Sequence, residues 1–554
     1  GGSRTEIFGN LNATGGVILI NPKGMLFGAE AEINTASFSA STLDIKPLDF
    51  SDANDVTLNN FDTNSLDSSI INFGAISVSD TGLVSLIAPQ VVNEGVISAK
   101  LGKVQLASGT SATLDLSGDG LLNIALDENA AGIIKNTGTI EGQNIRIGGG
   151  VASSFVNSTV NIDGFIQATG FDQDSSVDVQ SSGDIFVDGT ISSSESNTVD
   201  NGGSIKILGN RIALQDNTKI SSSGSNSGGE ILIGGNYLGR GPEPNASATV
   251  ILEGAQITAD ALVSGDGGRV IVWSDDYTNF AGSITAKGSD SGMGGFVETS
   301  SKNNIQVFGS VDVSGGLEGG TYLIDPSNVT ISDATNTGNN YGNFFEPNTD
   351  AATVDKDSII NSLQNGTSVV ITTRRGEENE NEDGNITVTS SLANINVNSS
   401  GSSGKSLTLF AAENIFVNNE ISAASGSNPL SVSLRAEGKI EIKNGADIIT
   451  RGGDFTVSGA NNVANAEIGQ SFNAEAGYFL LNTGSFIDTT GSSGKNGGDI
   501  TIRTIVRSSS LDAATTGHLD IKGNLITSGG TATSIGRAGG NVTLSAGLDT
   551  DGAS

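Results

Sequence analysis

Two short phrases recur along the chain at a nearly constant spacing. The first is a polar residue and a glycine within alternating apolar residues, as in NFGAISV from Asn72, NEGVISA from Asn93 and NTGTIEG from Asn136, whose starts lie 21 and 43 residues apart. The second opens with two glycines and occurs as GGSIKIL, GGEILIG, GGRVIVW, GGFVETS, GGDFTVS, GGDITIR and GGNVTLS from Gly202, Gly228, Gly267, Gly294, Gly452, Gly497 and Gly539. These spacings indicate an internal repeat of about 21 residues.

Each repeat holds two or three strands of about five residues, separated by Gly, Asn, Asp and Ser turns. Units of this kind predict an all-β fold, the right-handed parallel β-helix, in which every coil pairs with the coils above and below it. Small inward Val, Ile, Leu and Ala side chains would fill its narrow core, and glycine would supply positive-φ corners. An Asn at one corner of successive coils, as at Asn72 and Asn93, either stacks its amide on the next coil or simply suits a turn.

Composition agrees with a thin solenoid and argues against several classes of protein. Aromatic residues make up 5% of the 554 residues, too few for several thick cores, and the absence of Cys excludes disulfides and Cys-ligated zinc. A net charge of -34 argues against binding of nucleic acid, which needs clustered Lys and Arg. No apolar run approaches the roughly 18 residues of a transmembrane segment. The chain does not begin with Met and shows no signal peptide, so we expect a mature or truncated piece.

The repeat weakens between residues 331 and 384, where we expect a short irregular and helical interruption of the solenoid. Residues 355–366, DKDSIINSLQNG, predict one short amphipathic helix with Asp357 as its N-cap and Gly366 just past its end. The acidic stretch RRGEENENEDG that follows predicts a solvated loop. A second β-helical segment would then start near Asn385.

The N-terminal stretch carries a resemblance to a known family. IFGNLNATGGVILINPKGMLFGAEAEINTASFSASTLDI, residues 7–45, is similar to the secretion domain of the filamentous haemagglutinin and high-molecular-weight adhesin exoproteins of Gram-negative two-partner secretion systems. Similar phrasing follows in GLVSLIAPQVVNEGVISAKLGKVQLASG, LDLSGDGLLNIALDE, GGRVIVWSDD, GGFVETSSK and GGTYLIDPSNVTIS. The resemblance covers most of residues 1–460 in order, and beyond them only the repeat texture remains.

The resemblance implies a secreted adhesin on the cell surface of a Gram-negative bacterium. Its partners would be a dedicated outer-membrane barrel transporter and a host glycan, a host protein or a bacterial surface ligand, bound through the repetitive shaft. The implied domains are a two-partner secretion domain over residues 1–125 with its start missing, β-helix repeats over 126–330, a linker with the helix and acidic loop over 331–384, and a second β-helical segment over 385–554.

In that family an Asn-Pro-Asn-Gly turn helps to shape the domain that the transporter recognises. The motif falls here on Asn21, Pro22, Lys23 and Gly24, so Lys23 departs from the usual Asn. Pro22 presets its φ near -65° and Gly24 allows a left-handed exit, which together predict a rigid turn. The four residues either serve transporter recognition or form an ordinary β-turn.

Two other functions fit the same fold, namely a polysaccharide lyase or hydrolase and the stalk of a larger contact-dependent toxin or haemolysin. An enzyme of this kind needs a cleft lined by carboxylates and by basic or aromatic side chains. The acids here are scattered in turns, as at Asp119, Asp266 and Asp275, and the single histidine, His518, has no nucleophile signature nearby. The calcium-binding nonapeptide does not recur. We therefore predict no catalytic residue, metal site, cofactor or enzyme activity.

Overall fold

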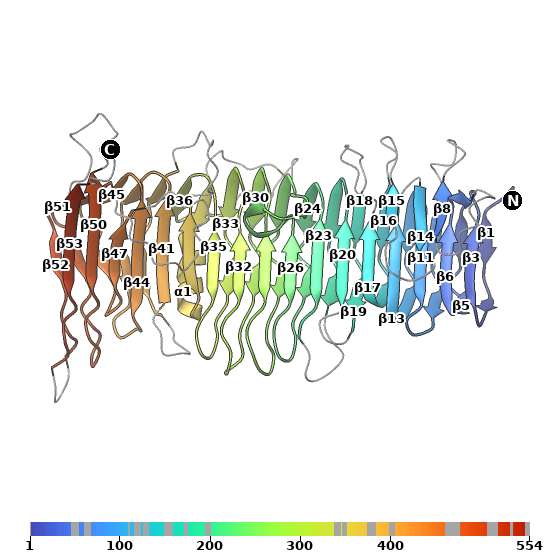
Figure 1. The fold of residues 1–554 in the computed structure, drawn as a ribbon, viewed down its shortest axis with the longest axis horizontal. Coiled ribbons are helices and arrows are strands. Elements are labelled where there is room, and N and C mark those ends of the chain that lie inside the picture. Colours follow the sequence, from blue (N-terminus) through green and yellow to red (C-terminus); the bar gives the residue numbers. More distant parts are fainter. Residues whose placement is uncertain are drawn as a thin grey trace, which may run out of the picture. The chain divides into compact units, whose positions relative to one another are not determined.

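Short strands that pair in parallel form most of the computed structural model (Figure 1). The chain divides into two units. Unit 1 comprises Gly1–Asn236, Arg240–Val263 and Gly268–Val272, and unit 2 comprises Tyr237–Gly239, Ser264–Gly267 and Trp273–Ser554. The described residues are 2–45, 55–59, 68–108, 111–115, 123–125, 132–148, 159–170, 175–193, 201–336, 345, 352–373, 384–397, 405–459, 477–506, 519–531 and 536–548.

The strands of unit 1 lie in three parallel stacks, so that each coil contributes one strand to each stack. Stack one contains β1 (Thr5–Ile7), β4 (Met25–Phe27), β9 (Ser69–Asn72), β12 (Gln90–Asn93), β16 (Ile133–Asn136), β18 (Thr159–Ile162), β21 (Asp184–Val187), β24 (Arg211–Leu214) and β27 (Ala248–Ile251). Stack two contains β2 (Asn10–Asn12), β5 (Glu32–Thr35), β10 (Ala75–Val78), β13 (Val96–Ala107), β17 (Thr139–Gly148), β19 (Phe165–Ala168), β22 (Thr190–Ser193), β25 (Lys219–Ser221) and β28 (Gln256–Thr258). Stack three contains β3 (Gly16–Ile20), β6 (Ser37–Ser41), β11 (Leu83–Ile87), the second halves of β13 and β17, β20 (Ser176–Gln180), β23 (Ser204–Leu208), β26 (Glu230–Ile233) and β29 (Arg269–Val272).

This arrangement is a parallel β-helix, as the repeat predicts, and its core is a set of aligned apolar columns. In stack two one inward position carries isoleucine in coil after coil, and every member of this column is at most 1% exposed: Ile33, Ile76, Ile97, Ile140, Ile166, Ile191, Ile220 and Ile257. Burial of each such side chain stabilises the fold by roughly 1.5–3 kcal/mol. A single coil could not bury this face, because the covering atoms belong to the coils on either side.

The glycine of the first phrase is required by close approach of the backbone. A Cβ built on Gly95 would collide with the carbonyl oxygen of Gly74, and one built on Gly138 would collide with that of Gly95. These glycines do not have positive φ, so the prediction that they supply left-handed corners is wrong for this column. Glycine is needed here because each coil passes directly over the corner of the one before it.

The recurring Asn of the first phrase forms an amide ladder, which settles the choice left open by the sequence. The Nδ2 of Asn72 donates to Oδ1 of Asn93 at 2.8 Å, and the Nδ2 of Asn93 donates to Oδ1 of Asn136 at 2.8 Å. All three side chains are fully buried. The ladder ends at Asn72 and Asn136, because neither has an Asn beyond it. The residue paired with Asn72 in the preceding coil is Phe27, and the residue paired with Asn136 in the following coil is Ile162.

A small antiparallel sheet accompanies the coils of unit 1. Its order is β15, β14, β8 and β7, with the bounds Asn123–Ala125, Ser111–Asp115, Asp55–Asn59 and Asp44–Ile45. β7 follows stack-three strand β6 and β14 follows β13, so the sheet is built from excursions that leave the coil at the same side.

Unit 2 also has three parallel stacks. The first contains β30 (Tyr277–Phe280), β33 (Asn304–Val307), β37 (Thr353–Asp355), β36 (Val329–Ser332), β39 (Ile386–Val388), β42 (Ile415–Val417), β45 (Lys439–Ile442), β48 (Tyr478–Leu481) and β51 (Leu519–Ile521). The second contains β31 (Ser283–Thr285) and β34 (Ser310–Asp312), and then β40 (Leu392–Ile395), β43 (Ile421–Ala423), β46 (Ile448–Ile449), β49 (Phe486–Asp488) and β52 (Asn524–Ile526). The third contains β32 (Phe296–Thr299), β35 (Thr321–Ile324), β38 (Ser368–Thr372), β41 (Lys405–Ala411), β44 (Leu430–Ala436), β47 (Phe455–Ser458), β50 (Ile500–Val506) and β53 (Val542–Leu548).

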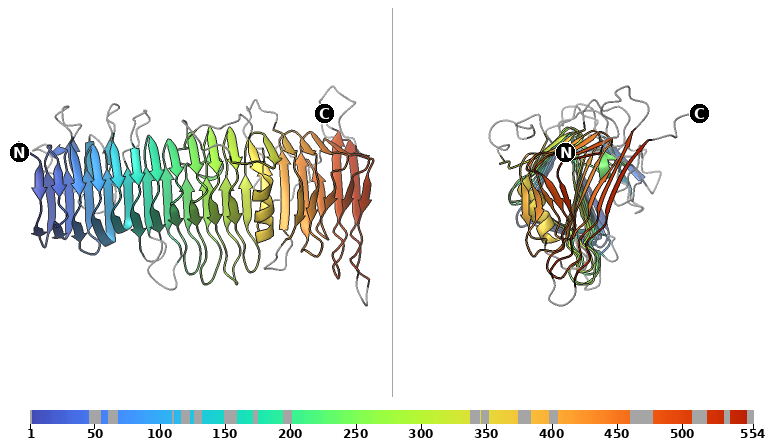
Figure 2. Two further views of the ribbon diagram at one scale, coloured as in Figure 1. Left: turned by 180° about the vertical axis from the view of Figure 1, so that it is seen from behind. Right: turned by 90° about the vertical axis from the view of Figure 1, so that its left-hand side faces the viewer.

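The predicted helix exists and takes the place of one strand. Helix α1 (Lys356–Asn365) packs against β34 on one side and β40 on the other, so it fills the gap in the second stack (Figure 2). The third stack continues past it without a break, because β38 pairs with both β35 and β41. Within the described residues, the interruption therefore consists of a helix in place of a strand of the second stack and of strand β37, which lies between β33 and β36 in the first stack. A short 3-10 turn, η2 (Tyr237–Gly239), also belongs to unit 2.

The helix ends as the sequence predicts but begins differently. Gly366 follows the last helical residue with φ 96°, in the left-handed conformation expected of a C-cap. The N-cap is Asp355 and not Asp357, because strand β37 runs directly into the helix; Asp357 lies in the first turn, where the helix dipole favours a carboxylate. The predicted acidic loop lies outside the described residues, and the domain boundaries at 125, 330 and 384 stay predictions.

Candidate functional site at the Asn21–Gly24 turn

The four residues singled out by the sequence form a compact turn between β3 and β4. The amide of Gly24 donates to the carbonyl of Asn21 at 3.0 Å, and the amide of Lys23 donates to Oδ1 of Asn21 at 3.0 Å. Of the four residues only Gly24 has positive φ, at 95°, which fits a type I turn with proline second and glycine last. All of these bonds are local, so the turn is stabilised by its own residues.

The same turn also bonds to distant parts of the chain. The Nδ2 of Asn21 donates to the carbonyl of Ser3 at 3.0 Å and to Oγ1 of Thr5 at 2.8 Å, and the amide of Thr5 donates to the carbonyl of Gly24 at 3.0 Å. The amide of Asn21 donates to the carbonyl of Ser41 at 3.0 Å. A Cβ on Gly24 would lie 2.7 Å from the carbonyl oxygen of Ser69. The turn thus touches the first three coils.

Burial divides the motif into an inner and an outer part. Asn21 is 7% exposed and Gly24 is buried, so their polar groups and backbone are occupied within the protein. Pro22 is half-buried and Lys23 is exposed. A partner protein would therefore contact the proline ring and the lysine side chain, whereas Asn21 and Gly24 fix the shape that presents them.

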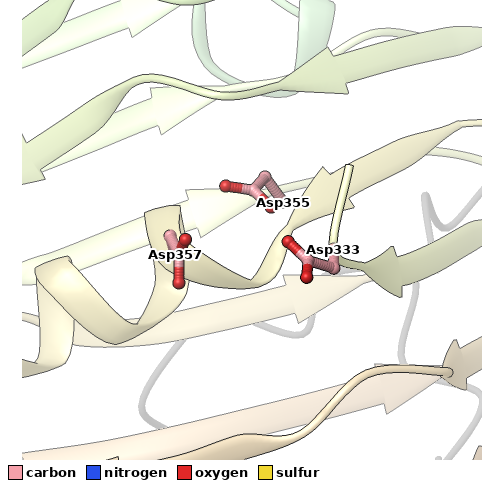
Figure 3. Close-up of side chains that lie close together, drawn as sticks. All are labelled: Asp333, Asp355 and Asp357. Carbon is pink, nitrogen blue, oxygen red and sulfur yellow. The ribbon is translucent and has the colours of Figure 1, made fainter. Parts of the chain in front are cut away.

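A second cluster, which the sequence did not single out, lies where α1 begins (Figure 3). Carboxylate oxygens of Asp333, Asp355 and Asp357 lie within 4.8 Å of one another. Asp333 follows β36, and Asp355 and Asp357 flank the first residue of α1. Asp333 lies about one repeat unit before the other two, and the parallel pairing of β36 with β37 brings the three acids together. That spacing was visible in the sequence, but the helix start that aligns them was not.

Lys356 balances much of the charge in this acidic cluster. Its Nζ lies 3.0 Å from Asp357 and 3.1 Å from Asp333, and these contacts raise the pKa of the Lys356 ammonium. Burial, together with the nearby charge of Asp357, raises the pKa of the Asp355 carboxyl, although the amide of Ala334 donates to it at 3.2 Å. With a lysine between the acids, the group is an ion-pair network at the entrance of the helix.

The other acids considered in the sequence are dispersed and have structural roles where they are described. Oδ1 of Asp266 accepts the amide of Met293 at 2.7 Å, and Oδ1 of Asp275 accepts the indole N–H of Trp273 at 3.1 Å. Asp119 and His518 lie outside the described residues. Within the described ranges, no helix is both long and apolar enough to cross a membrane.

Comparison with known proteins identifies the domain family of the part of the chain that contains the turn. Residues 1–207 match the family model of the TPS secretion domain. These residues form a TPS secretion domain. The Asn21–Gly24 turn, the amide ladder and the antiparallel excursions all lie within it. The match confirms, over residues 1–207, the resemblance to two-partner secretion exoproteins that the sequence indicated.

Two individual proteins resemble the chain over parts of their length. The heme/hemopexin-binding protein of Haemophilus influenzae is 34% identical over 153 residues, which are 26% of this chain and 17% of that protein. The crystal structure of the HMW1 secretion domain from Haemophilus influenzae aligns with 57% of this chain and 82% of its own, with 29% identity and a TM-score of 0.47. The chain thus spans less than a fifth of the curated relative that it matches.

Proposed function

We propose that this protein is a secreted adhesin that a dedicated outer-membrane barrel transporter exports to the surface of a Gram-negative bacterium. The TPS secretion domain is the observation that carries the proposal. In strands of both units, outward positions alternate with buried ones, and the outward residues are free to differ from coil to coil. Such a surface suits contacts with host glycans, host proteins or bacterial surfaces.

We also propose that this chain has no enzyme activity. In the described parts of the chain, the only group of three or more acidic, His or Cys side chains close enough to share an ion is the Asp333 cluster, and Lys356 pairs with two of its members. A glycoside hydrolase needs two carboxylates on opposite sides of a sugar-binding cleft. Polysaccharide cleavage by the purified chain that a single Asp→Asn substitution abolishes would overturn this part of the proposal.

We further propose that the transporter recognises the outer part of the Asn21–Gly24 turn, through Pro22 and Lys23. The test is export of Lys23→Glu, which reverses an exposed charge without touching the hydrogen bonds of the turn. We expect less secreted and more periplasmic protein, with the thermal midpoint of the purified chain unchanged. Lys23→Asn should export normally, because it restores the usual residue of the family.

Lys100→Glu is the matched control, since Lys100 is also an exposed lysine of the TPS secretion domain but lies away from the turn. Equal export of all three variants and the parent would make the turn a structural element only. The adhesin itself is tested by binding of the purified chain to host cells and to other bacteria in physiological salt. Absence of binding to both, together with a toxic or haemolytic activity in the whole protein, would favour the stalk of a toxin.

A further inference from the structure

The Asn21–Gly24 turn combines local hydrogen bonds with contacts to distant parts of the chain. Its two internal hydrogen bonds, Gly24 to Asn21 and Lys23 to Asn21, need no other part of the chain. Pro22 restricts the backbone conformations of the unfolded chain at the second position of the turn. Asn and glycine suit the first and fourth positions of a type I turn. These four residues are therefore able to form their native geometry while the surrounding chain is still extended.

Once formed, the turn offers docking points to segments that are far apart in the sequence. Asn21 bonds to Ser3 and Thr5 in the first coil and to Ser41 at the end of the second coil. Gly24 has no side chain, so the backbone of Ser69, at the start of the third coil, can lie where a Cβ of residue 24 would be. Parallel strands are not joined by a short hairpin, so their pairing costs loop-closure entropy. A turn that is already formed reduces this cost.

We infer that the Asn21–Gly24 turn is the folding nucleus of the first three coils, formed before the strands β1, β4 and β9 that pair around it. The order of assembly follows from the contacts. The turn forms first, residues 3–7 and 25–27 pair across it next, and β9 adds when residues 69–72 reach the space beside Gly24. This inference is independent of transporter recognition, because it concerns a property of the chain alone.

The test is refolding of the full chain from denaturant, followed by pulsed hydrogen exchange resolved to peptides. A brief unfolding period keeps the X-Pro bonds in their native isomers, so slow proline isomerisation does not obscure the rates. We expect Asn21→Ala to slow protection of β1 and β4 by about fivefold or more while changing their unfolding rate by less than about twofold, the signature of a contact made in the transition state. Pro22→Ala should show the same pattern and keeps the test valid if Asn21→Ala does not refold.

Asn34→Ala is the matched control, because Nδ2 of Asn34 donates to Oδ1 of Asn12 at 3.1 Å and so joins the same two coils through an exposed amide pair. It should leave the refolding rate unchanged. The inference is overturned if Asn21→Ala and Pro22→Ala refold within about twofold of the parent and only unfold faster, since the turn would then form after the rate-limiting step. Because no transporter is present in this experiment, its failure is distinct from failure of the export test.

Discussion

Asn93 is the residue on which the amide ladder depends, because it donates to Asn136 and accepts from Asn72. Asn93→Ala would leave the Nδ2 of Asn72 and the Oδ1 of Asn136 buried without their partners. Each buried polar group that loses its hydrogen bond costs about 1–3 kcal/mol. We expect the free energy of local opening to fall by about 2–4 kcal/mol, measured by native-state hydrogen exchange at β9, β12 and β16.

The exposed pair formed by Asn12 and Asn34 provides the comparison. Asn34→Ala removes a hydrogen bond of the same chemical type, but water replaces it, so the expected loss is below about 0.5 kcal/mol. Equal losses at Asn93 and Asn34 would show that the ladder contributes no more than a surface amide pair.

Lys405 is a charged residue that the fold buries, at 2% exposure, at the start of β41. Its ammonium lies beside Gly319, where an added Cβ would be 2.8 Å from Nζ. Burial lowers the pKa of Lys405, and the charge of Glu318 partly opposes this effect. The burial of Lys405 could not be predicted, because the preceding residues GSSG and the alternation SLTLFA place Lys405 at an ordinary strand start.

The lowered pKa of Lys405 predicts a pH dependence of stability in unit 2. Between the folded and the unfolded pKa the unfolded chain binds the extra proton, so stability rises with pH through this window, up to about pH 10. Lys405→Met keeps the aliphatic stem and removes the charge, and we expect it to stabilise unit 2 at pH 7 by on the order of 1 kcal/mol. The gain over the parent should shrink toward pH 10. Thermal midpoints at both pH values test this, and a variant that is less stable than the parent at pH 7 would contradict it.

At the scale of the element, the sequence predicted what depends on local pattern. The alternation in phrases such as GGSIKIL gave the strands, and the recurring spacing gave their parallel stacking. Residues 355–366 gave the helix and its end at Gly366. The turn at Asn21 was also predictable, since Asn, Pro and Gly each have a defined place in a type I turn.

Features that depend on how coils lie on one another were beyond the sequence. The helix could be recognised, but not that it substitutes for a strand between β34 and β40. Its N-cap was misplaced by two residues, because β37 runs into α1 without a loop. The role of Gly95 was misassigned for a similar reason, since only the neighbouring coil shows that its backbone passes over Gly74.

Substitution in α1 tests whether the helix is an integral part of the stack. Leu363 is fully buried, and Leu363→Ala should destabilise the helix and its neighbours β34 and β40 by about 2–5 kcal/mol. Exposed Asn361 on the same helix is the control, because Asn361→Ala raises helix propensity without loss of packing. Hydrogen exchange at β34 and β40 is the measurement. Faster exchange in α1 alone, with both strands unchanged, would mean that the helix only covers the stack.

At the scale of the whole molecule, the fold depends on contacts between successive coils. Strands in unit 1 pair with the coil before and the coil after, as β22 does with β19 and β25. Stability in such an array is approximately a sum of coil terms and nearest-neighbour terms. The net charge of -34 favours solubility and opposes compaction by repulsion between like charges. A defect in one coil should therefore remain local.

Ile191→Asp tests this locality. Ile191 is a fully buried member of the isoleucine column, and an aspartate there places an unpaired charge in the core at a cost of several kcal/mol. We expect faster hydrogen exchange in β22 and in the adjacent strands β19 and β25, falling off within one or two coils, with β41 and β44 of unit 2 as in the parent. Thr190→Asp is the control, because Thr190 points outward beside Lys219 and should change little. Uniformly faster exchange along the whole chain would contradict the nearest-neighbour description and show instead that the coils open as one cooperative body.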